Sequence, residues 1–572
     1  MSQKIADMAP LFFVIAGLIT LIYFLYQRNK VMLMFFQQEG YDGKRYLGWW
    51  ARNKAFDIRA SALLGVSLVY PPLHFMAPLG PLWGGLISRK YLKTAKKPLV
   101  MTERAKRIFH ISLILTVVYW IAIDRLIGRE MPYWYLVFVL IGLQLPPFTI
   151  LCANLLLSPA EKRVKNKFRQ EAVDKLAQLN PTIVALTGSY GKTSTKHILH
   201  HILSAANPTL MTPGSVNTEM GITRIVRENL KPEHDYFIVE MGAYGPGSIA
   251  RLCRLTPPHQ GVITAVGMAH YERFKSVDTV FGAKFELAEA VHQAGGTVTV
   301  HTDAIPERLL KPRLEADSGD YLLVGDQRNG YQNGIDLLSV TEKPDGLHLT
   351  IKLNGGYQQK PAAGANNHSD GASSTVQGQA EDSTGAKTHQ VFVPIYGTMQ
   401  ADNIICAIGC ALSLGYPMPV IKAALKDMPQ TRHRLEYTPP AGRAGILDDA
   451  FNSNPVGFEA ALDTLSVVTP EGGRRILITP GMVELGERHD HEHHRLGTLA
   501  AKNCDIVLVI TPDRIPAFIN GIEEAEGQNK PEVMTFETQQ AGQDWLNANA
   551  GALDVILYEN NLPDLFEQRI VF

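Results

Sequence analysis

The segment Thr187–Lys196 combines the residue types that bind and cleave a nucleoside triphosphate. It reads Thr-Gly-Ser-Tyr-Gly-Lys-Thr-Ser-Thr-Lys and lies between the apolar run 183–186 and a stretch of helical apolar spacing. Glycines let backbone N–H groups approach phosphate oxygens, and the N-terminus of the following helix adds partial positive charge. In such a loop the lysine reaches the outer phosphates and the next hydroxyl ligates magnesium. The expected cradle consists of Gly188, Ser189, Gly191, Lys192, Thr193 and Ser194.

The loop departs from the general phosphate-loop pattern at Leu186, where a glycine is usual. The shorter pattern T-G-x-x-G-K-[ST] remains, with an apolar strand before it and a helix after it, as the mechanics of the loop require. We therefore predict that the protein binds ATP and cleaves it.

Three further residues suit phosphate chemistry, although each also has an ordinary structural explanation. Glu240 closes an apolar run, and a carboxylate at the end of a strand beside the loop can hold magnesium. His270 follows another predicted strand, and Lys284 lies in a helical stretch. Taken singly, they also fit a solvated strand end, a structural histidine and a surface lysine.

The elements that must position these residues alternate between short apolar runs and helical stretches from about residue 180 onward. This alternation predicts an α/β fold with a mostly parallel sheet. A helix is expected over 403–414, and a strand-rich C-terminal unit should start near Leu435 after a boundary at 415–434. The segment 355–390 has few large apolar residues and is predicted to be a disordered insertion between two strands. The candidate strands are 183–186, 237–239, 262–264, 298–300, 347–353, 391–395, 446–447, 476–478 and 506–509.

The first 160 residues have a different character and are predicted to form a membrane domain. The stretches 10–27, 108–123 and 133–157 are apolar, uncharged and close to membrane-spanning length. The stretch 60–88 is also uncharged, but four prolines interrupt it. The basic loops on both sides of it indicate one cytoplasmic face, which favours a re-entrant or interfacial hairpin; a fourth simple crossing is the alternative. The basic run after residue 161 places the rest of the chain in the cytoplasm.

Composition excludes some classes of function. Lys plus Arg and Asp plus Glu each number 55, so no excess of positive charge favours a nucleic-acid partner. The five cysteines lack paired metal or redox spacing; Cys406 and Cys410, one turn apart in an apolar stretch, are expected to pack in the core. The histidine-rich run 489–494 should open a helix, with weak zinc binding by His489 and His493 as the less favoured interpretation.

Over residues 180–572 the chain resembles the Mur ligase family, and most of all the branch that adds the D-alanyl-D-alanine dipeptide. The resemblance implies a central phosphate-loop ATPase domain over 175–430 and a Rossmann-like C-terminal domain over 431–572, after the membrane domain 1–160. The stretches that carry it are 187–196, 214–221, 239–243, His270, 283–284, 433–436, 448–455 and 484–486 with His494.

The resemblance implies a role for each matching residue. Lys192 would hold phosphates, Thr193 and Glu240 would bind one magnesium ion, and His270 with a carbamylated Lys284 would serve a second. In the same way, the resemblance assigns adenine to Asn403, phosphates to Arg434, ribose to Asp449, and the substrates to Asn217, Asn452 and Asn454.

The chain also departs from the family. Met399 and Gln400 replace a common His-Asn pair, Phe451 replaces a tyrosine, and Pro480-Gly481-Met482 replaces Gly-Asp-Met. A membrane segment stands where the family has a domain that grips a UDP-sugar, so the carboxylate substrate is expected to be lipid-linked or polymeric.

These observations predict a membrane-bound, ATP-dependent ligase of a bacterial-type cytoplasmic membrane. It would join a carboxylate to an amino acid or dipeptide amine through an acyl phosphate, in cell-wall or surface-polymer synthesis. A non-catalytic ATP-binding module that scaffolds an envelope-building complex is the alternative. A transport ATPase is disfavoured because the predicted spans lack buried charge.

Overall fold

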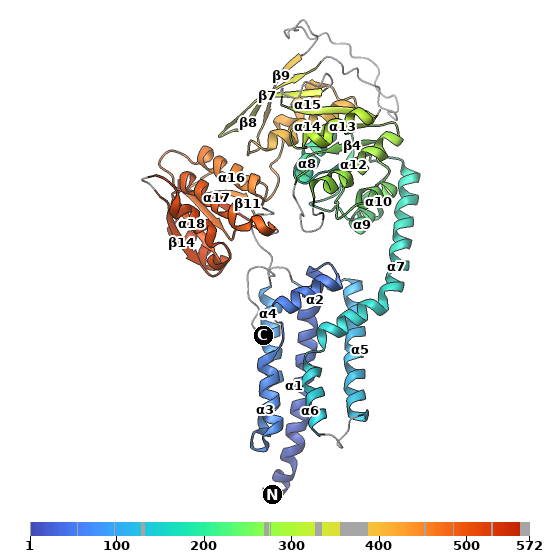
Figure 1. The fold of residues 1–572 in the computed structure, drawn as a ribbon, viewed down its shortest axis with the longest axis vertical. Coiled ribbons are helices and arrows are strands. Elements are labelled where there is room, and N and C mark those ends of the chain that lie inside the picture. Colours follow the sequence, from blue (N-terminus) through green and yellow to red (C-terminus); the bar gives the residue numbers. More distant parts are fainter. Residues whose placement is uncertain are drawn as a thin grey trace. The chain divides into compact units, whose positions relative to one another are not determined.

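The computed structural model describes residues 2–53, 55–95, 98–126, 132–267, 274, 276–317, 319–326, 334–354, 387–450, 453–483, 485–527 and 530–560. The chain divides between Asn166 and Lys167 into two compact units, each of which has its own core. Figure 1 traces the elements of both units along the chain.

The first unit is helical, and its long helices run side by side (Figure 1). Some of its polar contacts are buried: Ser112 Oγ donates to Asn29 Oδ1 at 2.6 Å and lies 2.8 Å from Thr149 Oγ1. These bonds join three helices within a mainly apolar core, in which Arg28 and Asp57 are also buried. The elements are α1 (Ser2–Gln38), α2 (Gly43–Arg52), α3 (Ile58–Val69), η1 (Pro71–Met76), α4 (Leu79–Thr94), α5 (Glu103–Leu126), α6 (Pro132–Leu143) and α7 (Pro146–Leu179), which continues into the second unit.

The chain reverses direction between residues 58 and 94. A Cβ atom built on Gly80 would lie 2.8 Å from the Ala60 carbonyl oxygen, and one on Gly84 would lie 2.9 Å from Asp57 Oδ2, so α4 returns along α3. Tyr70 precedes Pro71-Pro72, where prolines end the helical pairing. At 12 residues, α3 is about 18 Å long and shorter than the hydrocarbon core of a bilayer.

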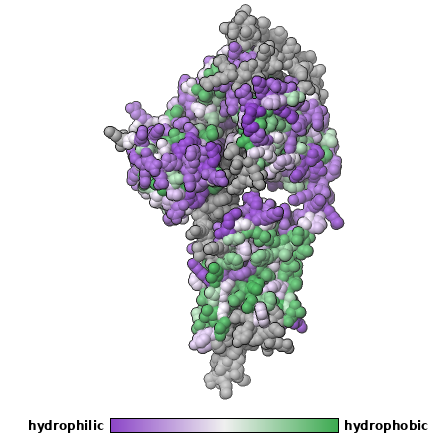
Figure 2. Space-filling model, viewed as in Figure 1, coloured by the Kyte–Doolittle hydropathy of each residue, from purple (hydrophilic) through white to green (hydrophobic). Residues whose placement is uncertain are grey.

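The surface of this unit is apolar. Among the described side chains, 30 of the 34 large apolar ones that are exposed lie between Phe13 and Val164. Figure 2 shows this face as mainly hydrophobic, whereas the visible face of the second unit is mainly hydrophilic. Within the described residues, α5 alone has the length and apolarity of a membrane span, and α6 with α7, bent by 67° at their junction, would count as a second if the pair forms one crossing.

The second unit begins with a nine-stranded sheet in the order β2-β3-β1-β4-β5-β6-β7-β8-β9. Pairing is parallel from β2 through β7 and antiparallel for the last three strands. This confirms the predicted α/β class. The strands are β1 (Thr182–Thr187), β2 (Thr209–Met211), β3 (Tyr236–Glu240), β4 (Gln260–Ile263), β5 (Thr297–His301), β6 (Asp320–Asp326), β7 (Gly334–Lys343), β8 (Gly346–Leu353) and β9 (Lys387–Val393).

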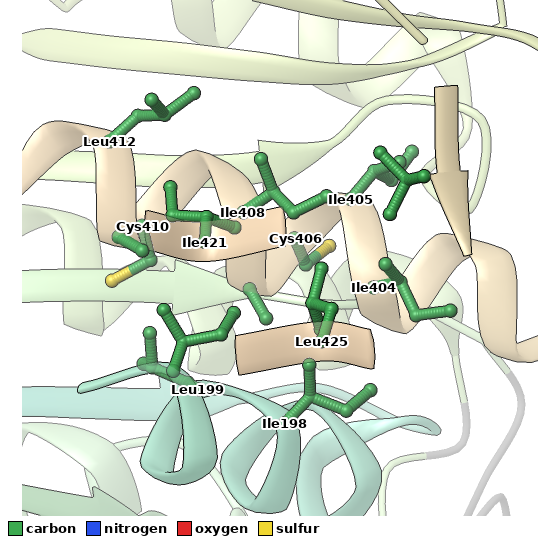
Figure 3. Close-up of a cluster of buried hydrophobic side chains, with 14 of the residues drawn as sticks. Ile198, Leu199, Ile404, Ile405, Cys406, Ile408, Cys410, Leu412, Ile421 and Leu425 are labelled. Atoms are coloured by element: carbon green, nitrogen blue, oxygen red, sulfur yellow. The ribbon is translucent and has the colours of Figure 1, made fainter. Parts of the chain in front are cut away.

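Helices cover both faces of this sheet, which explains why its central strands are continuous apolar runs. Figure 3 shows the core on the face of α8, α14 and α15, where Cys406 and Cys410 lie among Ile198, Leu199 and Leu425, as predicted. The end of α7, α9, α10, α12 and α13 cover the other face. The helices are α8 (Lys192–Ser204), α9 (Glu219–Asn229), α10 (Ser248–Leu255), α12 (Val277–Gln293), α13 (Glu307–Ala316), α14 (Gln400–Ser413) and α15 (Met418–Lys426).

The predicted insertion 355–390 is too long at its C-terminal end. Residues 387–390 belong to β9, whose pairing with β8 starts at Leu353↔Lys387. Antiparallel pairing orders these polar residues because their backbone groups gain partners, a contribution that composition does not reveal. Residues 355–386 lie outside the described ones.

The C-terminal part has a six-stranded sheet in the order β10-β11-β15-β12-β13-β14, parallel except for β10 with β11. Helices α16, α17 and α18 share one core beside it, and α19 packs on the other side. The elements are β10 (Glu436–Thr438), β11 (Gly445–Asp449), α16 (Pro455–Val468), β12 (Arg475–Thr479), η4 (Gly486–Arg488), α17 (His489–Asn503), β13 (Ile506–Ile510), η5 (Pro512–Arg514), α18 (Pro516–Glu524), β14 (Glu532–Phe536), α19 (Gln539–Asn549) and β15 (Val555–Glu559).

Candidate active site at the carboxyl edge of the large sheet

The predicted phosphate loop joins the end of β1 to the start of α8. Gly191 has φ of +78°, a left-handed conformation, and a Cβ atom there would lie 2.1 Å from Asn403 Oδ1. At Gly188 a Cβ atom would lie 1.9 Å from Thr264 Oγ1. Only glycine fits at either position, so the loop backbone stays close to its neighbours. Ser189 is fixed in turn, because its Oγ accepts from Gly267 N at 2.9 Å.

Lys192 and Lys284 line one cavity of about 30 Å³, together with Asn217 and Tyr244. Lys192 Nζ donates to the Gly188 carbonyl at 2.6 Å. Burial lowers the pKa of Lys192, and the charges of Arg434 and Lys196 lower it further, against the effect of Glu240. Burial and the Lys192 charge place the pKa of Lys284 well below its ordinary value. Two lysines that crowd each other in a cavity favour an anionic ligand, or a neutral amine at Lys284.

Glu240 ends β3 and is almost fully buried. The register Leu186↔Glu240 places it beside the phosphate loop. Its Oε2 accepts from Thr193 Oγ1 at 3.0 Å, and its Oε1 accepts from Asn217 Nδ2 at 3.1 Å. A carboxylate and a hydroxyl at this distance are the hard oxygen donors that magnesium prefers, so Thr193 and Glu240 fit the predicted ion.

Asn403 lies on α14 beneath the loop. Both the oxygen and the nitrogen of its side-chain amide form hydrogen bonds with described residues. Its Oδ1 accepts from Thr195 Oγ1 at 3.1 Å, and its Nδ2 donates to Gln400 Oε1 at 2.8 Å. Gln400, one of the departures from the family, therefore holds the side chain for which an adenine contact was predicted. That contact stays a prediction.

Arg434 and Ser194 border a second small cavity of about 10 Å³. Burial lowers the pKa of Arg434, and the charges of Asp449 and Glu240 oppose that effect. Burial raises the pKa of Asp449 to about 6, while Arg434 and the backbone N–H of Leu435 act in the opposite direction. These interactions place Arg434 within electrostatic range of both Glu240 and Asp449.

The roles predicted for Asn454, His270 and Asn452 stay predictions. Asn454 caps α16, because its Oδ1 accepts from Gly457 N at 3.0 Å. His270 and Asn452, together with Phe451 and Glu484, lie outside the described residues.

The histidine-rich run opens α17, as predicted. His493 is fully buried: its Nε2 accepts from Met482 N at 2.9 Å, and its Nδ1 lies 2.7 Å from the His489 carbonyl. Both ring nitrogens are therefore occupied, which does not fit the zinc interpretation.

Sequence reasoning gave no role to Lys196, although its ammonium group is buried at the site. Its side chain is fully buried, and its Nζ lies 3.0 Å from Glu240 Oε2. The signal was its position four residues after Lys192, which puts both lysines on one face of α8. Tyr244 and Phe274, which also line the cavity, carried no such signal.

Comparison with known proteins agrees with this geometry. Residues 186–411 match the Mur ligase middle domain, and residues 433–558 match the domain described as Mur ligase, glutamate ligase domain. The UDP-N-acetylmuramoyl-tripeptide--D-alanyl-D-alanine ligase of Mycobacterium tuberculosis (strain CDC 1551 / Oshkosh) is 32% identical over 364 residues, 61% of this chain and 62% of that protein. The enzyme of the same name from Escherichia coli (strain K12) is 28% identical over 58% of this chain and 65% of its own length. The matched part is thus less than two thirds of either relative.

The fold agrees as well. The crystal structure of the MurF ligase from Thermotoga maritima in complex with ADP aligns with a TM-score of 0.54 at 23% identity, over 71% of this chain and 82% of that one. A MurF structure from Acinetobacter baumannii gives 0.54 at 22% identity, over 69% and 77%. With the phosphate loop, Glu240 and Lys284 gathered at one sheet edge, and with both domain types matched in order, the chain belongs to the Mur ligase family.

Proposed function

We propose that the protein is an ATP-dependent ligase that forms an amide bond between a carboxylate and the amine of an amino acid or dipeptide, with release of ADP and phosphate. The observation that carries this proposal is the single cavity lined by the phosphate loop, Lys192, Lys284 and Asn217, next to the Thr193–Glu240 pair. A carboxylate is a poor electrophile in water, so transfer of the γ-phosphoryl group to it supplies the leaving group that the amine then displaces.

The residues of the chain divide this work. Loop amides and Lys192 would hold the phosphates, and Arg434 would add positive charge where charge develops during transfer. Thr193 and Glu240 would hold magnesium, which when bound neutralises the crowded phosphate oxygens. His270 and Lys284 are proposed for a second ion. Burial and the charge of Lys192 lower the pKa of Lys284, which favours the neutral amine that carbamylation needs; a carbamate would turn the side chain into an oxygen ligand.

The substrates are proposed from the relatives and from the first unit. The names of the relatives support D-alanyl-D-alanine as the amine. The apolar surface of residues 13–164 supports an anchor in a bacterial-type cytoplasmic membrane, with the catalytic part in the cytoplasm. An enzyme held there can act on a lipid-linked or polymeric carboxylate, so we propose such an acceptor in envelope synthesis.

An ADP-release screen tests the activity. The purified full-length protein is given ATP, Mg²⁺, one amine at a time and either a UDP-linked muramoyl tripeptide or native membrane lipid extract. We expect ADP formation that depends on both an amine and an acceptor, and mass spectrometry of the product identifies both. ATP binding without ADP formation under any combination of amine and acceptor would favour the non-catalytic scaffold.

A cysteine-accessibility scan tests the membrane arrangement. After replacement of the exposed Cys152, single cysteines are placed at Lys44, Lys93 and Lys162, all of them exposed. A hairpin over 58–94 predicts that an impermeant reagent labels all three from the same face. Labelling of Lys44 and Lys93 from opposite faces would overturn the hairpin. The anchor would be overturned if all three positions were labelled in protein that is recovered without any membrane fraction.

A further inference from the structure

Lys196 connects three parts of the site that belong to different elements. It lies on the second turn of α8, and its side chain is fully buried. Its Nζ donates to Glu240 Oε2 at 3.0 Å and also to the carbonyl oxygen of Gly214. One ammonium group therefore joins the helix of the phosphate loop, the carboxylate at the end of β3 and the segment 213–218.

The segment 213–218 is held to the same carboxylate from its other end. Asn217 Nδ2 donates to Glu240 Oε1 at 3.1 Å, and Gly242 N donates to the Asn217 carbonyl at 3.0 Å. Lys196 and Asn217 thus contact opposite oxygens of Glu240, while Thr193 shares Oε2 with the lysine. This arrangement leaves the carboxylate little freedom to rotate.

Such a lysine is costly to bury, and its position needs a reason beyond packing. Burial lowers the pKa of Lys196, and the charge of Glu240 opposes that effect. An apolar side chain of similar length would fill the same space without desolvation of a charge. What an apolar side chain cannot do is fix both Glu240 and the Gly214 carbonyl at once.

We infer that Lys196 is a positioning residue that holds Glu240 and the 213–218 segment in the geometry that receives the divalent cation. The inference rests on the proposed function, since it concerns the same site. Removal of a group that orients a metal ligand usually weakens metal affinity by about 10- to 100-fold.

The test measures metal and nucleotide separately on the full-length protein. Mn²⁺ binding in the presence of ADP is followed by electron paramagnetic resonance, and ADP binding in EDTA by calorimetry. For Lys196→Met we expect Mn²⁺ affinity to fall by about tenfold or more while metal-free ADP binding stays close to wild type. Lys175→Met is the matched control, because Lys175 also donates to a backbone carbonyl, that of Arg227, at 2.9 Å, away from the site.

A second variant approaches the lysine from its other partner. Gly214 has φ of +50° and open space around its Cβ position, so Gly214→Ala disturbs the backbone that presents the carbonyl without a clash. It should weaken Mn²⁺ binding in the same direction, and it decides the question if Lys196→Met does not fold. Wild-type Mn²⁺ affinity in the folded variants, or a parallel loss of metal-free ADP binding, would overturn the inference. Absence of Mn²⁺ and ADP binding in the wild type would instead overturn the proposed function.

Discussion

The carboxyl edges of the two sheets in the second unit gather opposite kinds of ionisable side chain, lysines at one and carboxyl groups at the other. At the large sheet, Lys192 and Lys284 line one cavity, and Lys196 pairs with the buried carboxylate of Glu240. At the C-terminal sheet, Asp449 and Glu559 end neighbouring strands as register partners. Burial lowers the pKa of Lys284 and raises the pKa of Glu559, and the neighbouring like charge adds to the shift in each case, so both edges favour neutral groups.

This difference indicates the charge of the ligand that each edge would bind. Buried like charges without a counter-ion are costly, and a bound ion of the opposite sign removes that cost. The large sheet is therefore prepared for an anion such as the phosphates of a nucleotide. At the C-terminal edge, Arg434 partly offsets the charge of Asp449, and protons or a further cation would stabilise Glu559. The proposed amine substrate is cationic at neutral pH.

The largest effect on this comparison is expected from removal of Lys192, the lysine of the phosphate loop at the edge of the large sheet. Lys192→Ala should reduce amine-dependent ADP release by about a thousandfold or more, because the charge that stabilises the transferring phosphoryl group is lost. A coupled assay of ADP measures this. Lys502→Ala, an exposed lysine on α17, is the control and should match wild type. Undiminished turnover in the Lys192 variant would contradict the assignment of the loop.

A second test asks whether Lys284 acts as a cation or as a modified amine. Lys284→Ala should lower turnover by about 100-fold, whereas Lys311→Ala on the exposed face of α13 should not. Protein equilibrated with ¹³C-bicarbonate should show a carbamate carbon signal that disappears in the Lys284 variant. Absence of the carbamate signal in wild type would exclude carbamylation and leave Lys284 as an unmodified lysine.

The opposite edge of the C-terminal sheet sharpens the comparison, because there a carboxylate has its partners. Asp554 accepts from Arg474 Nε at 3.0 Å, Arg474 N at 2.9 Å and Gly551 N at 2.7 Å. Burial alone would raise the pKa of Asp554, but these bonds lower it below the ordinary value.

The stabilisation from Asp554 is therefore present above about pH 4 and declines as the pH falls through its folded-state pKa. Asp554→Asn should cost about 1 to 3 kcal/mol at pH 7 and much less at low pH. Denaturant unfolding at several pH values measures this, and the exposed Asp544→Asn serves as control. A cost that does not change with pH would contradict the ionic contribution.

Glu559 should give the stability of the fold the opposite pH dependence. Ser453 donates to one of its oxygens, and the other has no hydrogen-bond partner among the described residues. Because its pKa is raised in the fold, the unfolded chain ionises first, and stability is lost as the pH rises from about 4 through the folded-state pKa.

Glu559→Gln should therefore stabilise the protein by about 1 to 2 kcal/mol at pH 8 and by little at pH 4. Thermal unfolding against Glu532→Gln, an exposed strand position, measures the difference. Equal stability of the Glu559 variant and wild type at pH 8 would show that the edge already holds a counter-ion.

Much of the second unit was predictable because its signals are local. Apolar runs located the central strands, and the glycine spacing located the phosphate loop. Long-range contacts were not predictable: the pairing that orders 387–390 depends on β8, and Lys196 acquires its partners only when β3 and the 213–218 segment meet α8.

Because α4 doubles back along α3, this segment does not change whether the number of membrane crossings is odd or even. A segment whose ends, near Asp57 and Thr94, emerge on one side contributes no net crossing. If α1, α5 and the bent α6–α7 pair each traverse the proposed bilayer once, the total is odd. A fluorescent tag fused ahead of the first helix would then report the compartment opposite to the one that supplies ATP.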